Sequence, residues 1–125
     1  MKEEVKKWWK IAKRDLDTSK YNLKGNILAA AAFYAQQAVE KGLKAVLIQK
    51  NKPFEKTHDV VKLSILVESP DRIRILCAKI QPVYIESRYP DAEEQDAFTK
   101  KDYIKELVNN ADEIIKWIGK KLEKK

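Results

Sequence analysis

Cysteine and histidine are almost absent from the chain, which holds one of each, Cys77 and His58, among its 125 residues. A single cysteine excludes an intramolecular disulfide and is typical of a reducing compartment. The sequence shows no metal-ligand spacing of cysteine and histidine, no phosphate-binding glycine loop and no nucleophile-elbow motif. We therefore expect no metal and no cofactor, and the common enzyme signatures are missing.

Glycine and proline are also scarce, with three and four residues respectively, while 44% of the residues are hydrophobic. This composition argues against disorder and against a turn-rich β architecture, and its length suits one domain over residues 1–125. No segment has the ~20 consecutive apolar residues that a membrane span needs. The charged N-terminal segment is not followed by an apolar stretch, so we expect no signal peptide, no membrane partner and a cytoplasmic protein.

The net charge is +7, from 26 Lys+Arg against 19 Asp+Glu, but only four of the basic residues are arginine. Nucleic-acid grooves usually employ arginine for bidentate and stacking contacts. A surface rich in lysine and glutamate is also typical of solubility or of a thermophilic source. We therefore interpret the positive charge mainly as a feature of solubility or of a thermophilic source rather than as a nucleic-acid-binding surface. It would still favour the approach of a phosphate.

Apolar residues recur with helical spacing along nearly the whole chain. The pattern predicts helices at about 2–23, 27–50, a short one after Thr57, one after Ser69-Pro70 with Pro82 inside it, and one from Thr99 to the C-terminus. No segment has the alternation of a strand. The predicted fold is therefore all-α, an up-and-down antiparallel helical bundle of four long helices plus one short helix.

The helix at 27–50 carries a row of small residues beside its larger apolar stripe. The row consists of Ala31, Ala35, Ala38, Gly42 and Ala45. Small side chains allow a second helix to approach closely, which makes this helix the central one. The second contact can be intramolecular or a dimer interface; we expect the first for part of the row and leave the rest open.

Three polar clusters are candidates for a site. Gln36, Glu40 and Lys44 follow each other at intervals of four, so they share one face of the central helix. His58 lies in the segment Lys56-Thr57-His58-Asp59, where Thr57 resembles an N-cap. The third cluster, Tyr84 to Asp91, includes Arg88 and Tyr89, and an arginine with an aromatic ring is suited to a phosphate and a base.

These segments, "AAFYAQQAVEKGLKAVL", "KTHDVVKL" and "YIESRYPD", occur in an order that resembles the HEPN family of small helical domains. The resemblance implies a homodimer of helical bundles and frequent pairing with a minimal nucleotidyltransferase in toxin–antitoxin-like modules. Many family members are metal-independent RNases with an Arg-x(4–6)-His motif. Here no arginine stands five to seven residues before His58, which favours a non-catalytic protein.

Three functions follow as hypotheses. The first is a non-catalytic HEPN module that binds a nucleotide, works with a nucleotidyltransferase, or both. The residues expected to bind the nucleotide are Glu40, Lys44, His58, Arg88 and Tyr89. Lys44 and Arg88 would hold phosphate, Tyr89 would stack on the base, and His58 would donate a hydrogen bond. The second is a divergent, metal-independent RNase toxin that uses His58 and Arg88. The third is a purely structural dimeric interaction protein whose small-residue row is the interface.

Overall fold

The computed structural model describes residues 1–53, 56–83 and 101–123. Its helices are α1 (Glu3–Lys24), α2 (Leu28–Gln49), α3 (Val60–Leu66), α4 (Asp71–Ile80) and α7 (Lys101–Glu123). No strand occurs within these ranges. The predicted all-α class and helical bundle are confirmed: α1 and α2 match the predicted helices at 2–23 and 27–50, and α3, α4 and α7 lie where helices were predicted.

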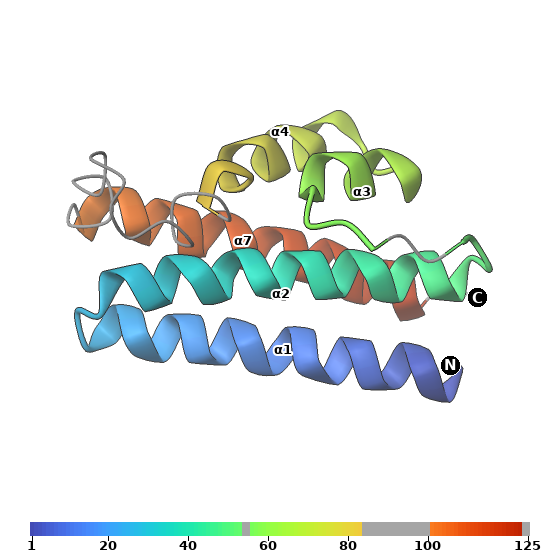
Figure 1. Cartoon of the computed structure of the whole chain (residues 1–125), viewed down its shortest axis with the longest axis horizontal. Helices are drawn as coiled ribbons and strands as arrows, with labels where there is room; N and C mark the ends of the chain where they lie inside the picture. Colours follow the sequence, from blue (N-terminus) through green and yellow to red (C-terminus); the bar gives the residue numbers. More distant parts are fainter. Residues whose placement is uncertain (54–55, 84–100, 124–125) are drawn as a thin grey trace.

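The three longest helices lie side by side along the length of the molecule (Figure 1). α1 runs antiparallel to α2, and α7 runs in the same direction as α2, while α3 and α4 lie across one side of the α2–α7 pair (Figure 1). The apolar faces of all five helices meet in one core. The regular spacing of Val5, Ala12 and Leu16 on α1 explains why this face, rather than the lysine-rich one, is buried.

α2 is the central helix, as predicted. Every member of its small-residue row is buried within the single chain: Ala31, Ala35, Ala38, Gly42 and Ala45. A Cβ atom placed on Gly42 would lie 2.9 Å from Ile118 Cδ1 on α7 and 3.7 Å from Ala12 Cβ on α1. The row therefore packs within the chain, as expected for part of it, and none of its members is exposed for the alternative that was left open, a dimer interface.

Three helices end in the same way, with a residue in the left-handed region after the last turn. These residues are Asn26, Asn51 and Glu68, with φ of 62°, 57° and 59°. In each case the next amide donates to a carbonyl five residues earlier, as in Ile27 to Asn22 and Lys52 to Leu47. Asparagine tolerates this conformation better than other non-glycine residues. The predicted turn at Gly25-Asn26 is present, but Asn26 rather than Gly25 adopts the positive φ.

The start of α3 and the end of α4 differ from the prediction. Asp59, not Thr57, caps α3, because the Asp59 side chain accepts a hydrogen bond from the Lys62 amide at 2.9 Å. Thr57 instead accepts from the Asp59 amide at 3.1 Å and so shapes the turn before the cap. α4 ends at Ile80, so Pro82 follows this helix and does not kink it. The predicted Tyr84 and Thr99 positions lie outside the described residues.

α3 is fastened to the end of α2 by two lysines. Lys52 Nζ donates to the carbonyl of Leu66 at 2.6 Å, and Lys50 Nζ donates to that of Val67 at 3.0 Å. A cation at the C-terminal end of a helix meets carbonyls that lack intrahelical partners, which stabilises the end. These hydrogen bonds hold the last turn of α3 against the end of α2. Among the helices of the described ranges, none is both long and apolar enough to cross a membrane.

Candidate functional site

The centre of the candidate site is the carboxylate of Glu40, halfway along α2. Its side chain is only 5% exposed, and it forms an ion pair with Lys44, whose Nζ lies 3.0 Å from Oε2. Because Lys44 follows one turn later on the same helix, α2 alone sets this geometry. A buried carboxylate is costly unless it is paired and hydrogen-bonded. Glu40 meets that condition through Lys44 and through two further partners.

His58 is the second partner of Glu40. Its Nδ1 lies 2.9 Å from Glu40 Oε1, although the two residues are 18 positions apart in the sequence. The Thr57 and Asp59 contacts at the start of α3 place the histidine over this point of α2. The His58 side chain is 51% exposed, whereas that of Glu40 is buried. The site thus consists of a half-exposed imidazole in hydrogen-bond contact with a buried carboxylate.

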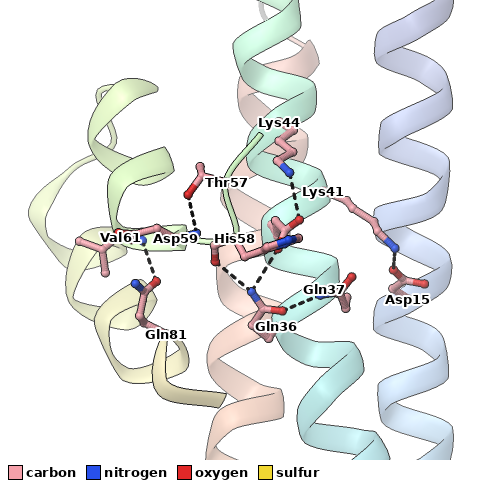
Figure 2. Close-up of polar contacts among 11 residues, drawn as sticks. Asp15, Gln36, Gln37, Lys41, Lys44, Thr57, His58, Asp59, Val61 and Gln81 are labelled. Carbon is pink, nitrogen blue, oxygen red and sulfur yellow. Dashed lines mark hydrogen bonds and ion pairs between the residues drawn. The ribbon is translucent and has the colours of Figure 1, made fainter. Parts of the chain in front are cut away.

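Gln36 makes the third contact, one turn before Glu40. Its Nε2 lies 3.4 Å from Glu40 Oε1 and 3.4 Å from the main-chain oxygen of His58. Gln37 Nε2 in turn donates to Gln36 Oε1 at 2.8 Å, which orients the buried amide. Figure 2 shows these side chains between α2 and the segment before α3. Both the ring and the backbone of His58 are therefore tied to the same face of α2.

Lys44 lies deeper than expected for a phosphate ligand. Its side chain is 6% exposed, and its ammonium lies 5.8 Å from the centre of the Trp8 ring on α1. A cation over an indole face is attracted by the ring quadrupole. The Lys44 ammonium thus contacts Trp8 of α1 and Glu40 of α2, and Glu40 in turn contacts His58. The role of Lys44 in holding phosphate stays a prediction. In the structure, Lys44 is the counter-ion of Glu40.

A second ion pair on α2 provides a comparison within the same helix. Lys41 Nζ lies 2.7 Å from Asp15 Oδ2 on α1, and the Asp15 side chain is 5% exposed. This pair joins two long helices and faces away from the His58 segment (Figure 2). Both ion pairs contain one buried carboxylate. The Glu40–Lys44 pair lies along α2, whereas the Lys41–Asp15 pair connects α2 with α1. Only the Glu40 pair also carries a titratable, exposed ring.

The sole cysteine is no part of this site. Cys77 is buried on α4, and burial raises the pKa of its thiol to about 12 despite a hydrogen bond with Ser64. The thiolate, which is the reactive form, is therefore scarce near neutral pH. Cys77 is a core residue. No cluster of three or more potential metal ligands occurs within the residues that the structure describes.

Three of the five predicted site residues come together: Glu40, Lys44 and His58. Arg88 and Tyr89 lie outside the described residues, so their roles, and a meeting of Arg88 with His58, stay predictions. The sequence placed Gln36 on the same helix face but gave no sign that it would reach the backbone of His58. It gave no sign of the Trp8 contact either, because that contact depends on the pairing of α1 with α2.

The fold and site together define a small helical-bundle protein with a polar cluster between its second helix and the following connection. The model of the HEPN domain matches residues 5–122. The chain therefore belongs to the HEPN family, as the resemblance of its three segments predicted. The comparison with curated proteins gives no match.

Solved structures show the same fold. TT1696 from Thermus thermophilus has a TM-score of 0.85 at 23% identity, covering 96% of this chain and 99% of that one. ST0689, an archaeal HEPN homologue, has a TM-score of 0.81 at 28% identity, covering 98% and 100%. A HEPN domain protein from Thermotoga maritima has a TM-score of 0.74 at 24% identity, covering 94% and 98%. The chain is thus similar to these proteins over nearly its whole length.

Proposed function

We propose that this protein is a non-catalytic HEPN module that binds a nucleotide, with a phosphate group contacting His58. The observation that carries the proposal is the exposed imidazole of His58, whose Nδ1 lies 2.9 Å from the buried carboxylate of Glu40. A ring held in one orientation loses less side-chain entropy when it contacts a ligand. A positively charged imidazole with a carboxylate behind it also remains a strong partner for a phosphate oxygen.

The charge balance supports an anionic ligand. Glu40 forms an ion pair with Lys44, so a proton taken up by His58 adds a positive charge at the exposed edge of the cluster. The whole chain carries +7, which raises the local concentration of anions and the rate of their approach. We propose that Arg88 and Tyr89 complete the site, with Arg88 on a phosphate and Tyr89 stacked on the base.

Calorimetry with ATP and related nucleotides tests this proposal. We expect binding by the wild type and a loss of about tenfold or more in affinity for His58→Ala, because a hydrogen bond to a charged group contributes about 1.5–3 kcal/mol. Arg88→Ala should weaken binding as well. Lys24→Ala is the matched control, because Lys24 is an exposed residue in the last turn of α1. This variant should bind as the wild type does. Absence of binding by the wild type contradicts the proposal.

We further propose that the module acts as a homodimer with a minimal nucleotidyltransferase as its partner, in a toxin–antitoxin-like system. Membership of the HEPN family supports this part of the proposal. Light scattering of the purified chain tests the dimer, and a monomer at micromolar concentration would contradict it. Co-purification with a small nucleotidyltransferase encoded beside this gene tests the partner.

One observation favours a second candidate, a metal-independent RNase. A histidine whose Nδ1 faces a carboxylate is oriented like a general base, since the carboxylate stabilises the imidazolium that forms after proton transfer. On this proposal His58 and Arg88 act together on RNA. Cleavage in the presence of a chelator, abolished in His58→Ala, would support it. Activity that persists in His58→Ala would contradict this mechanism.

A further inference from the structure

The contact between His58 and Glu40 determines which ring nitrogen carries the proton. A carboxylate that forms an ion pair with Lys44 has only acceptor oxygens, so the hydrogen in the 2.9 Å contact with Nδ1 belongs to the imidazole. The hydrogen bond made by one ring nitrogen fixes the tautomer of a histidine. Neutral His58 therefore holds its proton on Nδ1, and its Nε2 is then an acceptor rather than a donor.

An anionic ligand interacts differently with the neutral and the doubly protonated ring of His58. A phosphate oxygen is itself an acceptor, so it gains no hydrogen bond from Nε2 of the neutral ring. It gains one when His58 takes up a second proton. The resulting imidazolium then lies between two anions, the Glu40 carboxylate on the Nδ1 side and the phosphate on the Nε2 side.

From these contacts we propose that Glu40 is a positioning residue that fixes the Nδ1–H tautomer of His58 and couples phosphate binding to the uptake of one proton. The inference rests on the proposed function for its ligand, and on the structure alone for the tautomer. Gln36 supports the same arrangement because it holds both the Glu40 carboxylate and the main-chain oxygen of His58. Lys44 acts through Glu40, as its counter-ion.

The charged groups near His58 are consistent with this coupling. From α2 the ring meets Glu40, with Lys44 on the far side of the carboxylate. Along the chain, Lys56 and Asp59 lie within two positions, and the Asp59 side chain accepts from the Lys62 amide at the start of α3. From α1 the cluster meets the Trp8 ring, which carries no charge and lies over Lys44. Glu40 contacts the imidazole directly, with Oε1 at 2.9 Å from Nδ1.

Nitrogen NMR of the free protein tests the tautomer directly, since His58 is the only histidine and gives a single set of imidazole signals. At a pH where the ring is neutral, we expect a protonated Nδ1 and an unprotonated Nε2. A ring protonated mainly on Nε2 would overturn the inference. This measurement needs no variant and no ligand, so it decides the role of Glu40 even if nucleotide binding fails.

The variant Glu40→Gln/Lys44→Met tests the origin of the tautomer while removing both charges of the buried pair together, which is tolerated better than removing one. Asp15→Asn/Lys41→Met is the matched control, since it removes the other ion pair of α2. We expect the tautomer to shift toward Nε2–H in the first variant and to stay unchanged in the control. An unchanged tautomer in both would contradict positioning by Glu40.

Calorimetry of ATP binding in buffers with different ionisation enthalpies then tests the proton uptake. At a pH where NMR shows the free ring to be neutral, we expect the wild type to take up about one proton on binding. The uptake should vanish in His58→Ala and fall in Glu40→Gln/Lys44→Met, with affinity about tenfold lower in the latter. Binding without proton uptake would overturn the coupling. Absence of ATP binding would overturn the proposed function and its coupling, but not the tautomer.

Discussion

The three long helices and the α3 region differ in the contacts that join them to α2. α1, α2 and α7 meet through apolar and small side chains, and Gly42 lets Ile118 and Ala12 approach α2 closely. α3 places Val60 and Leu63 in the same core and is also joined to α2 by polar ties: Lys50 and Lys52 to its last carbonyls, and Gln36 and Glu40 to His58 just before it. The candidate site lies where the α3 region meets α2.

Apolar packing mainly stabilises the fold, whereas the hydrogen bonds near α3 mainly orient the side chains of the candidate site. Apolar packing is non-directional and proportional to buried area, so it supplies most of the stability of the three long helices. Hydrogen bonds contribute little net energy each but fix direction. Changes in the long helices should therefore unfold the whole domain, whereas changes in the ties of α3 should act mostly on that segment.

The largest expected effect comes from Gly42→Leu. Even a Cβ at this position would lie 2.9 Å from Ile118 Cδ1 and 3.2 Å from Ile115 Cδ1, so a leucine forces α7 away from α2. We expect a loss of about 3 kcal/mol or more in the free energy of unfolding, measured by urea denaturation. Gly25→Ala is the matched control. Its Cβ would meet nothing closer than 3.7 Å, and its stability should change by less than about 1 kcal/mol.

A smaller effect is expected from Lys52→Met, which removes the hydrogen bond to the Leu66 carbonyl and the ion pair with Glu68. We expect a loss of about 1 kcal/mol. Amide hydrogen exchange should accelerate in α3, while protection at the centre of α2 stays as in the wild type. Equal acceleration in both helices would show that α2 and the α3 region unfold as one unit. Lys10→Met, on the exposed face of α1, is the control.

The smallest effect is expected from Asp112→Asn in α7. Burial alone raises the pKa of Asp112, but hydrogen bonds and attraction from Lys20 and Lys116 outweigh it and lower the pKa below the ordinary 3.8. The stabilisation is therefore present above that value and is lost as pH falls through the folded-state pKa. The variant should be about 0.5 kcal/mol less stable near neutral pH.

This difference between Asp112→Asn and the wild type should disappear in acid, as the pH falls through the folded-state pKa of Asp112. Thermal or urea unfolding at several pH values measures it. Glu106→Gln, an exposed carboxylate on the same helix, serves as the control and should show no such pH dependence. A difference that persisted unchanged in acid would mean that the ion pairs with Lys20 and Lys116 are not its source.

The sequence predicted the long helices well because their apolar residues recur with the helical period, and this period alone selects the buried face. The row from Ala31 to Ala45 likewise indicated a close helix contact. Its partner could not be predicted, since small residues suit an intramolecular neighbour and a second chain equally. The structure supplies the partner, because Ile118 and Ile115 of α7 lie against Gly42.

The site was only partly predictable. Glu40 and Lys44 share a helix face by their spacing, but the meeting of Glu40 with His58 spans 18 residues and depends on how the connection folds. At the start of α3, Thr57 and Asp59 both suit an N-cap, and Asp59 takes the position. The lysine ties from the end of α2 to α3 have no sequence signature, because lysine is common on every helix of this chain.

The most direct test of the account is an NMR titration of the wild-type protein with ATP, observing the imidazole signals of His58. These signals are unambiguous because the chain has one histidine. We predict that they shift in a saturable manner toward the doubly protonated form, at a pH where the free ring is neutral. Saturable binding of ATP by the protein with no change in the His58 signals would contradict the account.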